Sequence, residues 1–366
     1  AYGNDGRSLD RPTSLSRATE IVQPGDTVYL RGGTYPIQVR FYRSGTSSDP
    51  ITWTSFPGEV AVFDGSDRTP AVDTDRMWVQ ASWNVFANFE VRSGPREGIQ
   101  LYQAHDNVFS HVVTHHNHTS GILVILSDRN RFEYVTTHDN FDEFNPSGRQ
   151  GDDADGISIS TGDGNYLHGV VSYRNSDDGI DAWRSTNTII DGCIAFENGR
   201  GTHGNGNGFK AGGNSDPNHT LVRNSIAFHN KSTGFTDNSG RYVTFVNNTA
   251  FENGSYGFSF GPTATLVNNL SVDDPVGIWG DGHHHNSWNL GIDDPQFLSV
   301  DPADSDFLAL SSWSSAVDAG IAMLDAPYAG SAPDLGALET SVQIAHLIGS
   351  PLQIGMADGT LTSAMR

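Results

Sequence analysis

The string Val171-Ser172-Tyr173-Arg174-Asn175 recurs three times downstream with its chemical pattern intact. Each copy runs from an apolar or β-branched residue through a small and an aromatic residue to a closing asparagine. The later copies are Ile194-Ala195-Phe196-Glu197-Asn198, Ile226-Ala227-Phe228-His229-Asn230 and Thr249-Ala250-Phe251-Glu252-Asn253. Their asparagines are 23, 32 and 23 residues apart, so the basic unit is about 23 residues and one unit carries an insertion. A fixed period of this length indicates a solenoid.

Each unit continues to a glycine followed by an apolar residue. These pairs are Gly121-Ile122, Gly156-Ile157, Gly179-Ile180, Gly208-Phe209, Gly234-Phe235, Gly257-Phe258 and Gly277-Ile278. Two or three short strands per unit, turning at asparagine and glycine, fit one coil of a parallel β-helix, because both residues accept the left-handed backbone of tight corners. A leucine-rich repeat has a similar period, but its leucine pattern is missing. We therefore predict an all-β fold built as a parallel β-helix solenoid.

Stacking of coils about 4.8 Å apart brings equivalent side chains together. The repeat predicts an aromatic stack of Tyr173, Phe196, Phe228 and Phe251. It also predicts a ladder of hydrogen-bonded amides from Asn175, Asn198, Asn230 and Asn253.

The two ends of the chain depart from the repeat. We expect one domain over residues 1–340, with an N-terminal cap over about 1–60 and a loop-rich C-terminal part over about 280–340. Residues 12–21 read as a short amphipathic helix, which would cover the open end of the solenoid. Residues 341–366 show no clear pattern, and their order is not predicted.

The charge of the chain limits its partners. Its 366 residues carry a formal net charge of −22, with a pI of about 4.7. This acidic balance argues against nucleic acid and against an anionic membrane surface as partners. No apolar stretch reaches the roughly 18 residues that a membrane span needs.

The chain uses two lysines against nineteen arginines. One of them, Lys210, lies in Gly208-Phe209-Lys210-Ala211, and a crowded lysine can lose its proton where arginine cannot. When positions are counted from the glycine-apolar pair, Asp155 and Asp178 occupy equivalent positions of neighbouring coils. Asp181 and Lys210 likewise share one column. Four carboxylates, including Asp177, are thereby predicted to meet one lysine on one face.

Neighbouring carboxylates repel one another, and a bound cation relieves that repulsion. Several oxygen ligands at irregular spacing suit Ca²⁺ better than Zn²⁺, which prefers histidine and cysteine. The alternative is that these acids are solvent-facing turn residues. The histidines are not expected to bind metal: His283-His284-His285 cannot all face one site in extended or helical geometry. A second group follows repeat positions and is expected in turns or stacks: His111, His115, His116, His118 and His138.

Three strings resemble polysaccharide lyase family 9. They are Ala154-Asp155-Gly156, Asn175-Ser176-Asp177-Asp178-Gly179-Ile180-Asp181 and Asn205-Gly206-Asn207-Gly208-Phe209-Lys210. The segment from Ala227 to Phe235 is also similar to that family. The resemblance runs from the N-terminal cap to about residue 275, and the low lysine content departs from what a long polyanion would favour.

This resemblance implies a right-handed β-helix with an N-terminal helical cap that cleaves uronate polysaccharides by β-elimination. Pectate is the favoured substrate and rhamnogalacturonan the next. It further implies Ca²⁺ held by Asp155, Asp177, Asp178 and Asp181, with Lys210 as the Brønsted base. A secreted monomer acting on an acidic polysaccharide at alkaline pH is the expectation.

Three further residues are candidates for substrate binding. Trp183 could stack on a sugar ring, Arg184 could pair with a uronate, and Lys231 could contact the chain; packing or solvent exposure are their other readings. Two other functions stay open at this point. One is a β-helix glycoside hydrolase that uses paired aspartates, and the other is a non-catalytic carbohydrate-binding β-helix.

Overall fold

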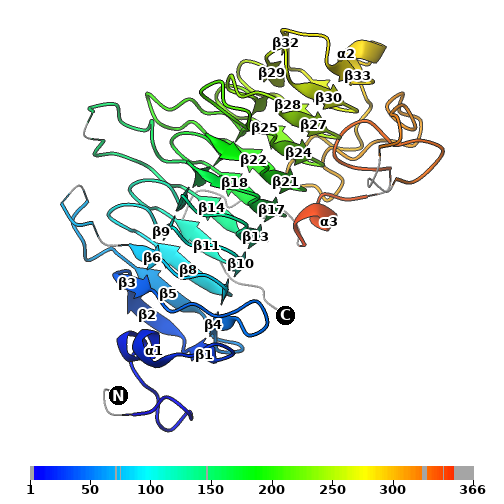
Figure 1. Ribbon diagram of the computed structural model, residues 1–366. Helices are drawn as coiled ribbons and strands as arrows, with labels where there is room; N and C mark the ends of the chain where they lie inside the picture. Colours follow the sequence, from blue (N-terminus) through cyan, green and yellow to red (C-terminus); the bar gives the residue numbers. More distant parts are fainter. Residues whose placement is uncertain are drawn as a thin grey trace.

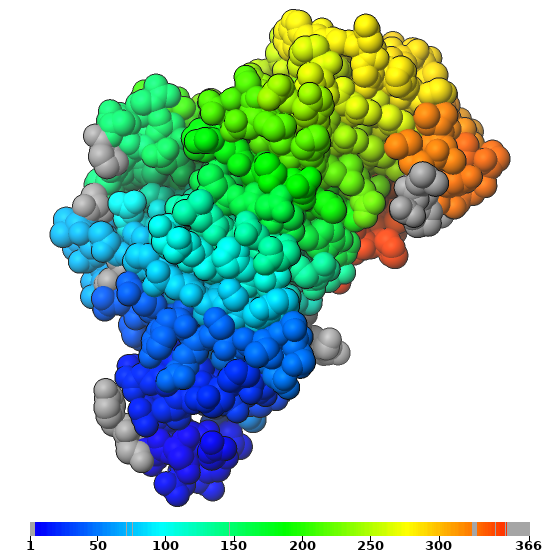
Figure 2. Space-filling model, in the orientation of Figure 1, coloured from blue at the N-terminus to red at the C-terminus, as the bar shows by residue number. Residues whose placement is uncertain are grey.

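A computed structural model describes residues 4–70, 72–74, 76–145, 147–323, 328–340 and 342–349. The chain winds into a parallel β-helix whose coils are stacked along the long axis of the molecule (Figure 1). The space-filling view shows the same elongated shape, with successive coils following the colour sequence from blue to yellow (Figure 2). The predicted all-β solenoid is confirmed.

Each coil contributes one strand to each of three long parallel sheets. The first sheet is formed by β1 (Thr27–Leu30), β4 (Ile51–Ser55), β7 (Asn84–Ala87), β10 (Val108–Ser110), β13 (Arg131–Glu133), β17 (Tyr166–His168), β21 (Ile189–Asp191), β24 (Leu221–Arg223), β27 (Thr244–Val246), β30 (Thr265–Val267) and β33 (His283–His284).

The second sheet carries the recurring aromatic string. It is formed by β2 (Gly33–Pro36), β5 (Ala61–Asp64), β8 (Phe89–Arg92), β11 (Val113–His115), β14 (Thr136–His138), β18 (Val171–Tyr173), β22 (Ile194–Phe196), β25 (Ile226–Phe228), β28 (Thr249–Phe251) and β31 (Leu270–Val272).

The third sheet follows the glycine-apolar pairs. It is formed by β3 (Val39–Phe41), β6 (Met77–Val79), β9 (Ile99–Tyr102), β12 (Ile122–Ile125), β15 (Ile157–Ile159), β19 (Ile180–Asp181), β23 (Phe209–Lys210), β26 (Phe235–Thr236), β29 (Phe258–Phe260) and β32 (Val276–Ile278). A short extra pair, β16 (Gly162–Asp163) and β20 (Ser185–Thr186), lies beyond it along the chain.

The lumen of the β-helix is filled by alternate side chains from all three sheets. Phe86, Phe109 and Phe132 stack at ring-centroid distances of 4.9 and 5.3 Å, and all three are fully buried. Fully burying one such side chain contributes about 1.5–3 kcal/mol. Because every coil places its apolar residues at the same positions, the core continues unbroken from one end of the stack to the other.

The predicted asparagine ladder is present and longer than expected. From Asn140 onward, each asparagine Oδ1 accepts hydrogen bonds from the backbone N–H and the Nδ2 of the ladder residue one coil earlier. The ladder runs through Asn117, Asn140, Asn175, Asn198, Asn230 and Asn253. Asn253 donates in turn to the Asp274 carboxylate, which ends the ladder.

The predicted aromatic stack lies on the outer face of the second sheet. Tyr173, Phe196 and Phe228 stack at 4.8 and 4.7 Å, and Phe251 pairs in register with Phe228. The C-terminal segment, drawn in orange, lies beside these coils in Figure 1. Its Phe307 packs edge-on against Phe228 at 4.9 Å, so this outer face forms a second apolar cluster.

Several boundaries differ from those predicted. The N-terminal helix α1 spans Leu15–Ile21 and starts three residues late, because Ser14 caps it by accepting from the N–H of Arg17. Strands begin at Thr27, inside the stretch 1–60 that was predicted as the N-terminal cap. Near the other end of the chain, the short helix α2 spans Ser287–Leu290.

The last glycine-apolar pair was assigned the wrong register. Phe258 pairs with Val276 and not with Ile278, because the ladder spacing shortens from 23 to 21 residues in this coil. Pro275 precedes the paired Val276, as glycine precedes the paired residue in earlier coils, and the Pro275 carbonyl accepts from the N–H of Gly257.

The expected tail contains folded residues. Helix α3 (Ala345–Ile348) follows Ile344, which is buried in the second apolar cluster. Residues 341 and 350–366 lie outside the described residues. In the part of the chain that is described, no helix has the length and apolar character that crossing a membrane requires.

Replacing Asp274 by asparagine is expected to stabilise the protein at pH 8 but not at pH 3. Burial raises the pKa of Asp274 to about 6, so its charged form is disfavoured in the folded state above that pH. Below its ordinary pKa of 3.8 the carboxyl is protonated in both states and the difference vanishes. Because Asp274 is partly exposed, we expect the substitution to raise the free energy of unfolding by only about 1 kcal/mol at pH 8. Thermal unfolding of both proteins at the two pH values measures it. An equal gain at both pH values would contradict the electrostatic cause.

Candidate active site

The register between coils places Lys210 beside Asp181, as predicted. Ile157 pairs with Ile180, and Ile180 pairs with Phe209, which puts Asp181 and Lys210 at equivalent positions of β19 and β23. Side chains alternate along a strand, so both point away from the lumen that their apolar neighbours fill.

Lys210 contacts two carboxylates. Its Nζ lies 2.7 Å from Asp181 Oδ2 and 3.1 Å from Asp178 Oδ2. The lysine side chain is 12% exposed, so it is largely shielded from solvent but not fully buried. Asp181 Oδ1 is buried and has no hydrogen-bond partner among the described residues.

Three of the four predicted ligands form a compact acidic cluster. Asp155, Asp177 and Asp178 are all buried, and one carboxylate oxygen from each lies within 4.8 Å of the others. Asp178 Oδ1 accepts from the backbone N–H and the amide of Asn207 at 2.7 and 2.9 Å. Asp181 stands outside this group of three and is held by Lys210.

Negative charge in this cluster is incompletely compensated. Burial and the neighbouring carboxylates raise the pKa of Asp155 well above its ordinary value. Burial and Asp178 raise the pKa of Asp177 to about 8, and burial raises that of Asp181 to about 6 although Lys210 opposes it. Burial alone would lower the pKa of Lys210, but Asp181, Asp178 and Asp155 outweigh it and the pKa is raised.

A loop that the sequence analysis did not single out orients two of the acids. Residues 199–207 are part of the insertion that lengthens this coil to 32 residues between its ladder asparagines. The backbone N–H of Asn205 donates to Asp177 Oδ1, and that of Asn207 donates to Asp178. The irregular spacing was a visible signal that this coil carries an added loop, but spacing alone does not reveal where its amides point.

A second acidic group lies nearby. Asp142, Asp152 and Asp153 also bring carboxylate oxygens within 4.8 Å of one another. Here the Asn145 amide nitrogen lies 2.9, 2.6 and 2.8 Å from oxygens of the three carboxylates, and its two N–H groups donate to them. The Arg149 guanidinium also pairs with Asp152, so this group already has a cation and an amide donor among the described residues.

Lys231 holds the loop over residues 199–207. Its Nζ donates to the carbonyls of Gly201 and Gly204 at 2.9 and 3.0 Å, so two of the three N–H groups of the ammonium bond to the loop. Gly206 has a φ of +74°, and a Cβ there would lie 2.7 Å from the Lys231 side chain. In this arrangement the ammonium supports the loop that orients Asp177 and Asp178.

Trp183 and Arg184 follow Asp181 at the edge of the site. Trp183 is 40% exposed and packs against Gly213 in the next coil. Arg184 pairs with Asp216 at 3.1 Å, and its guanidinium lies 5.5 Å from the Trp183 ring centre. Both side chains are accessible to solvent, as a sugar-binding role requires.

Known proteins share both the fold and the sequence. The family description "Pel9A-like, right handed beta helix region" matches residues 2–270. Pectate lyase L of Dickeya dadantii (strain 3937) is 31% identical over 92% of this chain and 88% of its own length. Pectate lyase PEL9 of Emericella nidulans is 32% identical over 80% of this chain and 83% of its own length. The crystal structure of pectate lyase Pel9A superposes with a TM-score of 0.84 at 30% identity, covering 92% of this chain and 94% of that chain.

Fold, site and relatives together define a parallel β-helix polysaccharide lyase. The chain belongs to the Pel9A-like right-handed β-helix family, which also confirms the predicted handedness. Of the three functions that the sequence left open, the lyase is the one that these relatives support.

Replacing Lys231 by methionine is expected to loosen the 199–207 loop. Two hydrogen bonds from a charged donor are lost, which we expect to lower the free energy of local opening by about 2 kcal/mol. Hydrogen exchange at Asn205 and Asn207 should then be more than tenfold faster. Arg241→Met is the matched control, because Arg241 donates to the Ser215 carbonyl outside the loop. Equal exchange in both variants would show that Lys231 does not support the loop.

Proposed function

We propose that the protein cleaves a uronate-containing polysaccharide by β-elimination, with pectate as the favoured substrate and rhamnogalacturonan next. The observation that carries the proposal is Lys210, held within 3.1 Å of Asp178 and Asp181 on the outer face of three consecutive coils. A row of parallel coils provides an extended surface along which a polymer can lie. The pectate lyases similar to this chain support the substrate class.

The acidic cluster fits a calcium ion. Carboxylate oxygens are the ligands that Ca²⁺ takes, and the cluster offers them from Asp155, Asp177 and Asp178. The unpartnered Oδ1 of Asp181 supplies a further buried oxygen beside them. When bound, Ca²⁺ would neutralise these acids and withdraw charge from the substrate carboxylate.

Lys210 is proposed as the base. Elimination breaks the C5–H bond, whose proton passes to Nζ, while the electron pair forms the C4–C5 double bond. The C4–O bond breaks, and the departing oxygen takes a proton from solvent. Lys210 needs its neutral form for this step, so its contacts with Asp178 and Asp181 have to weaken in the working enzyme. Trp183 and Arg184, at the edge of the site, are proposed to contact the sugar chain.

Substituting Lys210 distinguishes a base from a structural cation. Lys210→Ala is expected to lower turnover by about 10²–10⁴-fold, the usual contribution of a general base. Lys210→Arg keeps the positive charge beside Asp181 but cannot give up its proton, so it is expected to be equally inactive. The readout is the ultraviolet absorbance of the unsaturated product formed from polygalacturonate and from rhamnogalacturonan. Near-normal turnover in Lys210→Arg would refute the assignment, provided both variants keep the wild-type circular dichroism.

The two acidic groups allow a matched test of calcium binding. Excess chelator should abolish product formation, and added CaCl₂ should restore it. Asp177→Asn is expected to raise the calcium concentration needed for half-maximal activity by about tenfold or more, because it removes a charged ligand. Asp153→Asn changes an acid that Asn145 already satisfies, and should leave that concentration unchanged. An equal effect of both substitutions would place the ion elsewhere.

A further inference from the structure

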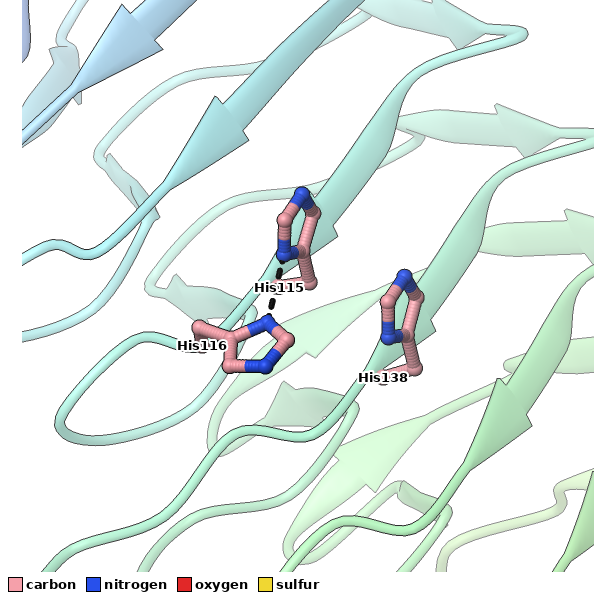
Figure 3. A group of neighbouring side chains, drawn as sticks. All are labelled: His115, His116 and His138. Carbon is pink, nitrogen blue, oxygen red and sulfur yellow. Dashed lines mark hydrogen bonds between the residues drawn. The ribbon is translucent and has the colours of Figure 1, made fainter. Parts of the chain in front are cut away.

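Three histidines meet on the outer face of the second sheet, whereas Lys210 lies on the third. His115 ends β11 and His138 ends β14, and their rings stack at 4.7 Å with an interplanar angle of 3°. His116 turns its ring toward both of them (Figure 3). One ring nitrogen from each histidine lies within 4.8 Å of the other two.

The backbone corner after β11 makes this convergence possible. Adjacent residues of an extended strand point to opposite faces, so two consecutive histidines ordinarily diverge. His116 adopts a left-handed conformation with a φ of 53°, which swings its side chain back beside His115. Their Nδ1 atoms are 2.6 Å apart, so a single proton lies between two ring nitrogens.

The Glu90 carboxylate orients the His115 ring through its Nε2 atom. Glu90 lies 3.1 Å from His115 Nε2, and this hydrogen bond, opposed by burial, lowers the pKa of Glu90. The ionised carboxylate can only accept, so His115 Nε2 carries the proton and Nδ1 presents its lone pair to the cluster. Metal-binding histidines typically donate their second ring N–H to a carboxylate in this manner.

The two ring nitrogens of His138 differ in their hydrogen bonding. Its Nδ1 lies 2.7 Å from Asp139 Oδ2, while its buried Nε2 has no partner among the described residues. The side chain is 7% exposed. Because Nε2 is free to take the ring proton, His138 can release Nδ1 as a ligand at the cost of one hydrogen bond. Arg174 and Arg200 contact the same Asp139 carboxylate at 2.6 and 2.9 Å, so Asp139 keeps its charge partners after that change.

We propose that His115, His116 and His138 form a binding site for a divalent transition metal that prefers imidazole ligands, with Zn²⁺ as the foremost candidate. Three neutral imidazoles suit Zn²⁺ and do not suit Ca²⁺, whose ligands are oxygens. Burial lowers the pKa of both His116 and His138, which favours their neutral, metal-binding forms. Water or Asp139 would complete the coordination.

The geometry requires one ring to move. Zinc–nitrogen bonds of about 2.0–2.1 Å in a tetrahedral site separate the nitrogens by roughly 3.3 Å. The 2.6 Å contact between His115 and His116 is shorter than that, so one ring has to shift outward. His116 is the exposed member and can make the shift, while stacking holds His115 and His138 in place. The bound ion would tie the coil of β11 to the coil of β14.

Zinc titration of the full chain tests the site. The calorimetric titration uses ZnCl₂ with CaCl₂ at saturating concentration, so that the acidic cluster is already occupied. Wild type is compared with His116→Gln and with His229→Gln. His229 is the matched control, because it occupies the equivalent left-handed corner (φ 52°) of a later coil and pairs with Glu252 at 3.0 Å.

One zinc equivalent is expected in wild type and in His229→Gln, and His116→Gln should bind it at least about tenfold more weakly. Zinc should also raise the thermal midpoint of wild type and His229→Gln but not of His116→Gln. Unchanged zinc binding in His116→Gln, or no zinc binding by wild type at micromolar protein concentration, would overturn the proposal. The variant changes an exposed side chain, and its circular dichroism without zinc should match wild type.

Discussion

The register between successive coils is the constraint on which the rest of the structure depends. Each ladder asparagine receives two hydrogen bonds from the preceding coil, so a slip of one residue would break the ladder at every corner. The same slip would turn lumen phenylalanines outward and separate Lys210 from Asp181. A buried amide that has lost its partners costs about 1–3 kcal/mol, which makes the correct register strongly favoured.

Insertions are tolerated only where they leave that register unchanged. The ladder spacing grows from 23 to 35 residues between Asn140 and Asn175, and to 32 between Asn198 and Asn230. In both coils the strands before and after the insertion still pair with their neighbours. The added residues form loops near the lysine: one carries the acids around Asn145, and the other gives its amides to Asp177 and Asp178. The regular scaffold thus sets the positions of the acids, and the irregular loops set their orientation.

Periodic features of the molecule were predictable from sequence, and non-periodic ones were not. The pairing of Asp181 with Lys210 follows from counting residues between glycine-apolar pairs. The same count failed at Val276, where a shortened coil replaces the glycine by Pro275. The contacts of Lys231 with Gly201 and Gly204 were not predicted, because they depend on loop geometry that no repeat encodes, and its contact with substrate stays a prediction. The packing of Phe307 on the aromatic stack is a long-range contact of the same kind.

The electrostatics of the site connect the proposed metal to the proposed base. Four buried acids lie around one lysine. Burial, and then repulsion from Asp178, raise the pKa of Asp177 to about 8, and the single ammonium does not offset them. The same acids raise the pKa of Lys210, which holds its proton in place. A divalent cation among Asp155, Asp177 and Asp178 would compete with the ammonium for those charges. Binding of the cation would then weaken the contacts that keep Lys210 protonated. In this account Lys210 can act as a base only when the cation is bound.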